Sequence, residues 1–136
     1  MIFMPVDSLT SNLKVSVITV CYNSAKTIGK TVKSVADQKL VSIQHIIKDG
    51  RSTDETISEI RKAGINRHVD LIEGVDQGVY DAMNVGFKSA TGDIVCFLNS
   101  DDSFVDSNVL SDVVCAFEKK DADFVYGNIS MVGSDG

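Results

Sequence analysis

Five short segments rich in β-branched residues alternate along the chain with four segments whose apolar residues recur every three or four positions. Alternation of this kind is typical of a largely parallel β-sheet with helices on both faces. The sequence therefore predicts an α/β, Rossmann-like fold with about five strands and four helices. The strands are expected over residues 15–22, 43–48, 69–73, 94–98 and 123–129.

Capping residues and apolar spacing predict where the helices lie. The first helix is expected over about residues 25–38, with Asn23 or Ser24 as its cap. The second is expected to begin at Ser52 or Thr53 and to end at Gly64. Apolar residues at helical spacing mark the other two: Val79, Met83, Gly86, Phe87 and Ala90, then Val109, Leu110, Val113, Val114 and Phe117.

The length of 136 residues fits one domain. Residues 14–129 carry the strand–helix pattern and form the expected domain, with an N-terminal tail over 1–13 and a C-terminal tail over 130–136. The N-terminus has neither a basic start nor a sustained apolar core, so we expect no signal peptide. The longest apolar runs are too short to span a bilayer.

Charge and cysteine usage restrict the partners. The formal net charge is −6, with 13 basic and 19 acidic residues, and no stretch is dense in Lys or Arg. This pattern argues against a nucleic-acid partner and favours phosphate binding through a metal ion or backbone amides. Cys21, Cys96 and Cys115 lie in apolar segments without a CxxC spacing, which predicts buried free thiols in a reducing compartment.

Polar loops follow four of the expected strands, beginning at Tyr22, Asp49, Asp76 and Asn99. In a parallel sheet the carboxyl ends of the strands share one edge, and ligands bind there. The sequence therefore predicts a binding site built from these four loops.

Each polar group also has a structural alternative. Asp101, in Asn99-Ser100-Asp101-Asp102, suits a Mg²⁺ or Mn²⁺ ligand, but the segment also suits a turn or a helix cap. Asp49 is either a hydrogen-bond acceptor for a base or ribose, or a turn residue beside Gly50. Tyr22 either stacks on a base or belongs to the core.

Two further motifs lie beside these loops. Asp81 and Asn84 are three residues apart on one helical face, so both are placed to line one cleft, unless they belong to an ordinary polar helix start. Residues 24–31, SAKTIGKT, nearly match a phosphate-binding P-loop, but Ser24 replaces the first glycine and Ile28 fits the helix pattern. Lys26 and Lys30 are therefore expected to be solvated helix residues.

Three segments carry a resemblance to a known family: VSVITVCYN, KDGRSTDET and DQGVYDAMNVGFKSATGDIVCFLNSDD. They resemble the bacterial family 2 glycosyltransferases of the GT-A fold, over about residues 14–129. The resemblance implies a nucleotide-sugar donor, usually a UDP-sugar. It also implies inverting transfer to a glycan or lipid-linked sugar acceptor in polysaccharide or glycan biosynthesis.

The resemblance also implies roles for individual residues. Tyr22 matches the aromatic residue that packs on the base, and Asp49 matches the carboxylate that reads the uracil edge. Asn99-Ser100-Asp101 occupies the DxD position, where Asp101 would bind Mn²⁺ or Mg²⁺; Asn99 replaces the first Asp and brings no charge. The expected nucleotide-binding set is Val20, Tyr22, Asn23, Asp49, Asp76, Asn99 and Ser100, and the expected donor/acceptor cleft is Asp81, Asn84 and Asp102.

One part of the family pattern is absent from these residues. The family's general base lies well after the DxD segment, so we expect it beyond Gly136 and read the chain as the nucleotide-binding portion of a longer enzyme. That enzyme is expected in the cytoplasm, either free or peripheral to the inner face of the membrane. Two alternatives remain open: a nucleotide-binding module without transfer activity, and a nucleotidyltransferase, for which residues 23–26 are a poor triphosphate loop.

Overall fold

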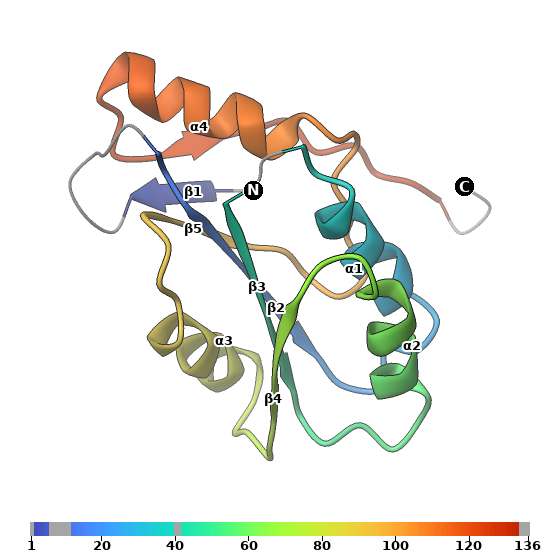
Figure 1. Ribbon diagram of the computed structural model, residues 1–136. Helices are drawn as coiled ribbons and strands as arrows, with labels where there is room; N and C mark the ends of the chain where they lie inside the picture. The colour runs from blue at the N-terminus through green and yellow to red at the C-terminus, as the bar shows by residue number, and fades with distance from the viewer. Residues whose placement is uncertain (1, 6–11, 40–41, 134–136) are drawn as a thin grey trace.

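The computed structural model describes residues 2–5, 12–39 and 42–133. They form a six-stranded sheet in the order β4-β3-β2-β5-β1-β6 (Figure 1). The strands are β1 (Ile2–Pro5), β2 (Val15–Cys21), β3 (Ile43–Asp49), β4 (Val69–Glu73), β5 (Ile94–Phe97) and β6 (Val125–Tyr126). The helices are α1 (Ile28–Ala36), α2 (Thr56–Ala63), α3 (Val79–Lys88) and α4 (Val109–Lys120).

Four neighbouring strands of this sheet, β4, β3, β2 and β5, run parallel. The predicted fold class, a largely parallel α/β sheet, is confirmed. The remaining pairings are antiparallel: β1 lies between β5 and β6 and runs against both. Residues 2–5 were expected to belong to a loose tail, whereas they form β1, and Phe3 is only 2% exposed. The four residues of β1, which end in proline, carry little strand signal in the sequence. They form a strand by pairing with β5, about 90 residues later in the chain.

Three helices cover one face of the sheet and α3 covers the other. Val17, Val35 and Phe117 belong to one buried cluster that joins β2, α1 and α4. Ile47, Val32 and Ile60 belong to a second cluster, which joins β3, α1 and α2. On the opposite face, Ile18, Ile46 and Val95 form a smaller cluster beneath α3. Helices therefore lie on both faces, as predicted.

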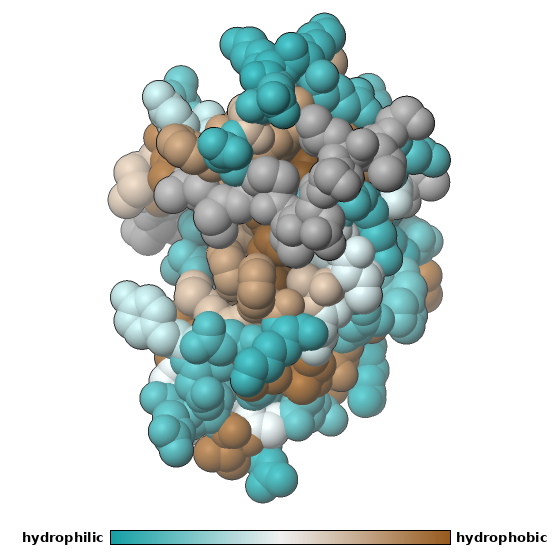
Figure 2. Space-filling view, turned by 90° about the vertical axis from the view of Figure 1, so that its left-hand side faces the viewer, coloured by the Kyte–Doolittle hydropathy of each residue, from teal (hydrophilic) through white to brown (hydrophobic). Residues whose placement is uncertain are grey.

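α3 packs through small residues rather than through its large apolar ones. Gly86 lies against Ile18, where an added Cβ would come within 2.5 Å of the Ile18 Cγ2. Val79 and Phe87 were expected on the buried side of this helix, but they are 58% and 45% exposed. In Figure 2, which views the molecule from the side of β1 and α3, a band of hydrophobic side chains reaches the surface between the levels of α4 and α3.

Several predicted boundaries and caps were wrong. α1 begins at Ile28, after a turn in which the Ser24 carbonyl accepts the N–H groups of Thr27 and Ile28. Ser52 and Thr53 do not cap α2; instead Asp54 Oδ1 accepts the Thr56 N–H at 3.0 Å and the Thr56 hydroxyl at 2.5 Å. These bonds lower the pKa of the Asp54 carboxyl below its usual value. Several Ser, Thr and Asp residues compete for each helix start, and spacing alone does not rank them.

His45 is a buried polar residue in the middle of the sheet. It is 2% exposed, and its Nε2 lies 3.1 Å from the Thr19 hydroxyl on the neighbouring strand. Burial lowers the pKa of the His45 imidazole to about 3, because the charged form would lose its hydration. The folded chain therefore keeps His45 neutral across the whole mildly acidic range.

This burial makes stability depend on pH. Below about pH 6.5 the His45 imidazole binds a proton in the unfolded chain, whereas in the folded chain it stays neutral down to about pH 3. The free energy of unfolding therefore decreases as the pH falls. We expect His45→Gln to remove up to about 1.4 kcal/mol per pH unit of this slope. Urea unfolding between about pH 7 and pH 4.5 measures it. His68→Gln, at an exposed histidine, is the control; equal slopes in the wild type and His45→Gln would contradict the prediction.

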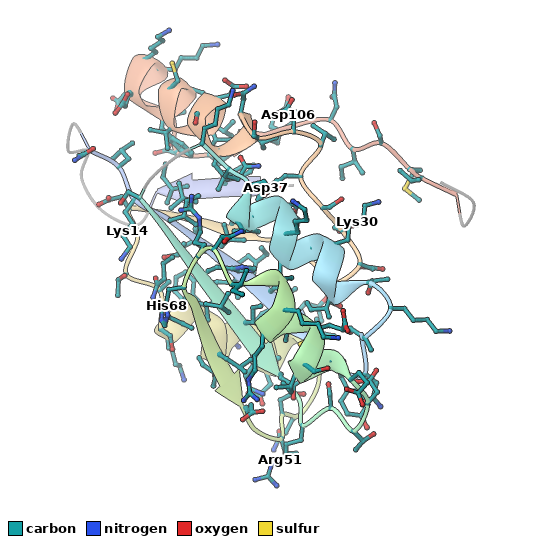
Figure 3. All side chains as sticks on the ribbon, turned by 45° about the vertical axis from the view of Figure 1, so that its right-hand side comes forward. Lys14, Lys30, Asp37, Arg51, His68 and Asp106 are labelled. Carbon is teal, nitrogen blue, oxygen red and sulfur yellow. The ribbon has the colours of Figure 1, made fainter. Side chains whose placement is uncertain are left out.

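Arg51 adopts a backbone conformation that suits glycine better. Its φ is +61°, in the left-handed region, and its side chain points away from the molecule beyond the ends of β3 and β4 (Figure 3). A side chain in this region costs about 1–2 kcal/mol, because Cβ crowds the carbonyl oxygen. Glycine avoids this cost, but part of the gain is offset because glycine has more conformational freedom in the unfolded chain, which favours unfolding.

We therefore expect Arg51→Gly to raise the free energy of unfolding by about 0.5–1 kcal/mol. Arg51→Ala removes the same exposed side chain but keeps Cβ, and should give no such gain. Chemical denaturation of both variants beside the wild type makes the comparison. Equal stability of the glycine and alanine variants would show that the left-handed backbone carries no strain.

Candidate functional site

The loops that follow β2 and β3 are tied together at the carboxyl edge of the sheet. The Asn23 N–H donates to the Ser52 hydroxyl at 2.8 Å, and Asn23 Oδ1 accepts the Thr53 N–H at 2.8 Å. Asn23 itself has a φ of +47°, which asparagine tolerates better than most residues. Asn23, predicted to touch a nucleotide, thus holds two loops in register with both its main chain and its side chain.

Gly50 lies close between two of the predicted site residues, with little room for a side chain. A methyl group added there would lie 3.1 Å from Asp76 Oδ2 and 3.5 Å from Tyr22 Cδ2. The Tyr22 side chain is 62% exposed, so its ring belongs to the surface and not to the core. The structure thus brings Tyr22 and Asp76 together around the Gly50 backbone, which approaches both of them closely because glycine has no side chain.

Asp49 lies beneath this position and is only 1% exposed. Its carboxylate accepts the Ser52 N–H at 2.8 Å and the Ser52 hydroxyl at 2.5 Å. Cys21 Sγ lies 3.5 Å from the same carboxylate. Burial, and then the Asp49 charge, raise the pKa of the Cys21 thiol to about 12, so the thiol stays protonated. A ligand that bonds to Asp49 must therefore share it with Ser52.

The sequence analysis missed Lys48, which joins the ends of β3 and β4. Its side chain is 3% exposed, and Nζ donates to the Asp49 carbonyl at 3.0 Å, the Gly74 carbonyl at 2.5 Å and Asp76 Oδ2 at 3.1 Å. The signal in the sequence was a single lysine at the end of an apolar strand. Val20, another predicted site residue, is half-buried on β2 and pairs with Lys48 in the sheet register.

The segment after β5 presents carboxylates to solvent. Asn99, Asp101 and Asp102 are exposed, and Asn99 Nδ2 lies 3.4 Å from Asp102 Oδ2. The Ser100 hydroxyl lies 3.1 Å from the Ser24 hydroxyl, which connects this segment to the loop after β2. Within the described residues, the Asp101 carboxylate makes no hydrogen bond or ion pair, so it is open to a ligand.

These side chains fit a hard cation that completes its coordination elsewhere. In the described part of the chain, no three His, Cys, Asp or Glu residues gather closely enough to hold a metal ion. Asp101 and Asp102 can supply one or two oxygen ligands, which is the usual number when Mg²⁺ or Mn²⁺ is bound together with phosphate oxygens. The donor set therefore suits a metal–diphosphate complex better than a metal ion alone.

The two residues expected in a second part of the cleft lie on α3. Asp81 Oδ2 accepts the Gln77 N–H at 3.0 Å, which caps the helix start, and Asn84 is exposed one turn later. No hydrogen bond among the described residues joins either side chain to Tyr22 or Asp101. A groove of about 290 Å³ lies elsewhere, between α1 and residues 103–107, beside the predicted site and not within it.

Comparisons with known proteins show the family to which the chain belongs. The sequence model of glycosyl transferase family 2 matches residues 16–136. A PGL/p-HBAD biosynthesis glycosyltransferase of Mycobacterium bovis (strain BCG / Pasteur 1173P2) is 35% identical over 119 residues, which cover 85% of this chain and 46% of the relative. The UDP-Glc:alpha-D-GlcNAc-diphosphoundecaprenol beta-1,3-glucosyltransferase WfaP of Escherichia coli is 34% identical over 114 residues, 84% of this chain and 45% of the relative.

A solved structure shows the same fold. The mannosyltransferase PcManGT from Pyrobaculum calidifontis, in complex with GDP-Man and Mn²⁺, superposes with a TM-score of 0.73 and 25% identity, covering 82% of this chain and 34% of that protein. The predicted GT-A fold is thereby confirmed. The chain spans about half the length of the curated relatives it matches. From the extent of the family match and the identity to these relatives, the chain belongs to glycosyl transferase family 2.

Proposed function

We propose that this chain binds the nucleotide-sugar donor of a glycosyltransferase that transfers the sugar, with inversion, to a glycan or lipid-linked acceptor. One observation carries the proposal: an exposed aromatic ring, Tyr22, and two exposed carboxylates, Asp101 and Asp102, lie along one edge of the sheet. A base can stack on the ring, and a cation bound to a diphosphate needs carboxylate ligands. Family membership favours glycosyl transfer over nucleotidyl transfer.

We expect the nucleotide base to lie on Tyr22 above Gly50. Base-on-ring stacking contributes about 1–3 kcal/mol for each base. Asp49 would accept the N3–H of uracil on the lone pairs that Ser52 leaves free, which favours UDP over CDP. The name of the WfaP relative, a UDP-Glc-dependent enzyme, supports uridine, whereas PcManGT was solved with GDP-Man. Asp76, Asn99 and Ser100 complete the expected contacts to the nucleotide.

Asp101, helped by Asp102, would hold Mn²⁺ or Mg²⁺ against the diphosphate. When bound, the cation supplies positive charge that stabilises the departing nucleoside diphosphate. The open Asp101 carboxylate supports this role, as does the Mn²⁺ in the PcManGT complex. Asn99 replaces an acidic residue beside this site, so the protein contributes one charge less than a DxD segment would.

Asp81, Asn84 and Asp102 are proposed to line the cleft between donor and acceptor. The base that deprotonates the acceptor is proposed to lie outside residues 1–136. The WfaP name, which includes a diphosphoundecaprenol-linked sugar, supports a lipid-linked acceptor and a cytoplasmic site of action near the membrane. None of the helices among the described residues has the length and apolar character needed to cross a bilayer.

The proposal predicts metal-dependent binding of UDP that rests on Asp101. We expect Mn²⁺ to tighten UDP binding to the wild type, and Asp101→Ala to weaken the binding in Mn²⁺ by about tenfold or more. In EDTA the two proteins should bind UDP alike, because Asp101 then has no cation to hold. Isothermal titration calorimetry measures all four affinities.

Asp123→Ala removes another exposed aspartate, on the segment leading into β6, and is the matched control. Titrations with CDP and GDP test the choice of base. Equal Mn²⁺-dependent affinity in the wild type and Asp101→Ala would rule out Asp101 as a metal ligand. No binding of any nucleoside diphosphate to the wild type would overturn the proposed function.

A further inference from the structure

Three polar side chains form a row along the buried side of α1 and just past its C-terminal end. Thr31, Ser34 and Gln38 are spaced by three and four residues, so they face the same direction. Thr31 is 1% exposed and Gln38 is 3% exposed, although both are polar. Buried polar groups of this kind persist because their hydrogen bonds offset the lost hydration. Their partners therefore indicate what the row does.

Thr31 contacts the main chain on either side of Asp101. Its hydroxyl lies 2.6 Å from the Asp102 carbonyl and 3.0 Å from the Ser100 carbonyl. The single hydroxyl proton is thus shared between two acceptors that flank the proposed metal ligand. The Asp101 carboxylate itself is exposed to solvent. Thr31 therefore restrains the main chain around Asp101 without making a hydrogen bond to the carboxylate.

The other two residues hold the chain that follows. The Ser34 hydroxyl accepts the Phe104 N–H at 3.1 Å and donates to the Thr31 carbonyl at 2.8 Å. Gln38 Nε2 donates to the Asp106 carbonyl at 2.6 Å, and Gln38 Oε1 accepts the Leu110 N–H at 3.0 Å. Figure 3 shows Asp106 on this segment above α1. Every one of these contacts with residues 100–110 is to main-chain atoms.

We propose that Thr31 is the positioning residue for the metal-binding segment, with Ser34 and Gln38 fixing the same stretch of chain as far as the start of α4. This inference rests on the proposed function. A carboxylate that binds a cation must be held within about 0.5 Å of its productive place. The Asp102 N–H to Asn99 carbonyl bond, at 3.1 Å, is local, and the Ser24 hydroxyl contacts the Ser100 side chain. By contrast, Thr31 on α1 bonds to the main chain on both sides of Asp101.

Thr31→Val tests the proposal, because valine keeps the shape of threonine and removes only the hydroxyl donor. We expect the affinity for UDP in Mn²⁺ to fall by about tenfold, as is usual when a residue that orients a metal ligand is lost. In EDTA the affinity should fall less than in Mn²⁺, since without a cation only the expected contacts of Asn99 and Ser100 with the nucleotide depend on this segment. Thr31→Ser, which keeps the donor, should restore the Mn²⁺ effect.

Thr91→Val is the matched control. Thr91 lies at the opposite edge of the sheet, and its hydroxyl contacts Gln44 Oε1 and Lys14 Nζ, so the same substitution removes hydrogen bonds far from the site. Thr91→Val should leave the ratio of the UDP affinity in Mn²⁺ to the UDP affinity in EDTA unchanged. Amide hydrogen exchange adds a readout without ligand: exchange at Asp102 and Phe104 should accelerate in Thr31→Val and not in Thr91→Val.

The outcomes separate this inference from the proposed function. Absence of UDP binding in the wild type overturns the proposed function, and with it the inference. If the wild type shows the Mn²⁺ effect and a folded Thr31→Val retains it in full, the inference alone is wrong. If Thr31→Val does not fold, Ser34→Ala decides, because Ser34 is only partly buried: an Mn²⁺ effect equal to that of the wild type overturns the inference, and a reduced one supports it.

Discussion

The parallel pairing of β2 with β3 and β5 is the constraint on which the rest of the structure depends. It places the carboxyl ends of consecutive strands at one edge, so that loops from residues 22–27, 50–55, 74–78 and 98–108 meet there. The main-chain N–H and carbonyl groups of these loops lie beyond the hydrogen bonds that join the parallel strands. They therefore need hydrogen-bond partners outside the sheet.

Most of the partners are polar side chains that are buried below the surface: Lys48, Asp49 and Thr31, with Asn23 exposed beside them. Lys48 contacts the chain on both sides of the β3–β4 edge, Asn23 and Asp49 engage the loop around Ser52, and Thr31 contacts the segment after β5. Lys48 and Thr31 use atoms that a ligand would not reach, and Asp49 is shared between Ser52 and the proposed ligand. This leaves Tyr22 and Asp101, which make the outer surface, free to meet one. A rigid inner layer beneath an open outer layer reduces the ordering that binding requires.

The sequence predicted the elements better than it predicted these contacts. Apolar periodicity sufficed for the four parallel strands and for the existence of all four helices, because burial on a sheet or helix face is a local pattern. It also predicted the edge where Tyr22, Asp49, Asp76 and Asn99 lie. The roles of Lys48 and Thr31 were not predicted, because most of their partners are main-chain carbonyls, which every residue carries and which a sequence pattern therefore does not distinguish. The buried side of α3 was misjudged for a related reason: close packing selected Gly86 and left Phe87 outside.

The position of β1 has a consequence for how the chain assembles. β2, β3 and β4 pair with strands that are near in sequence, so they can form as soon as about half of the chain exists. β1 has to wait until β5 has been made, and β6 joins the sheet only through β1. Residues 2–5, although made before β2, are therefore among the last of the described residues to find their place, and they join the sheet between two strands that come much later in the sequence. A change in residues 2–5 acts on the β5–β1–β6 side of the sheet and on the order of folding, not on the β2–β3 pair that follows in sequence.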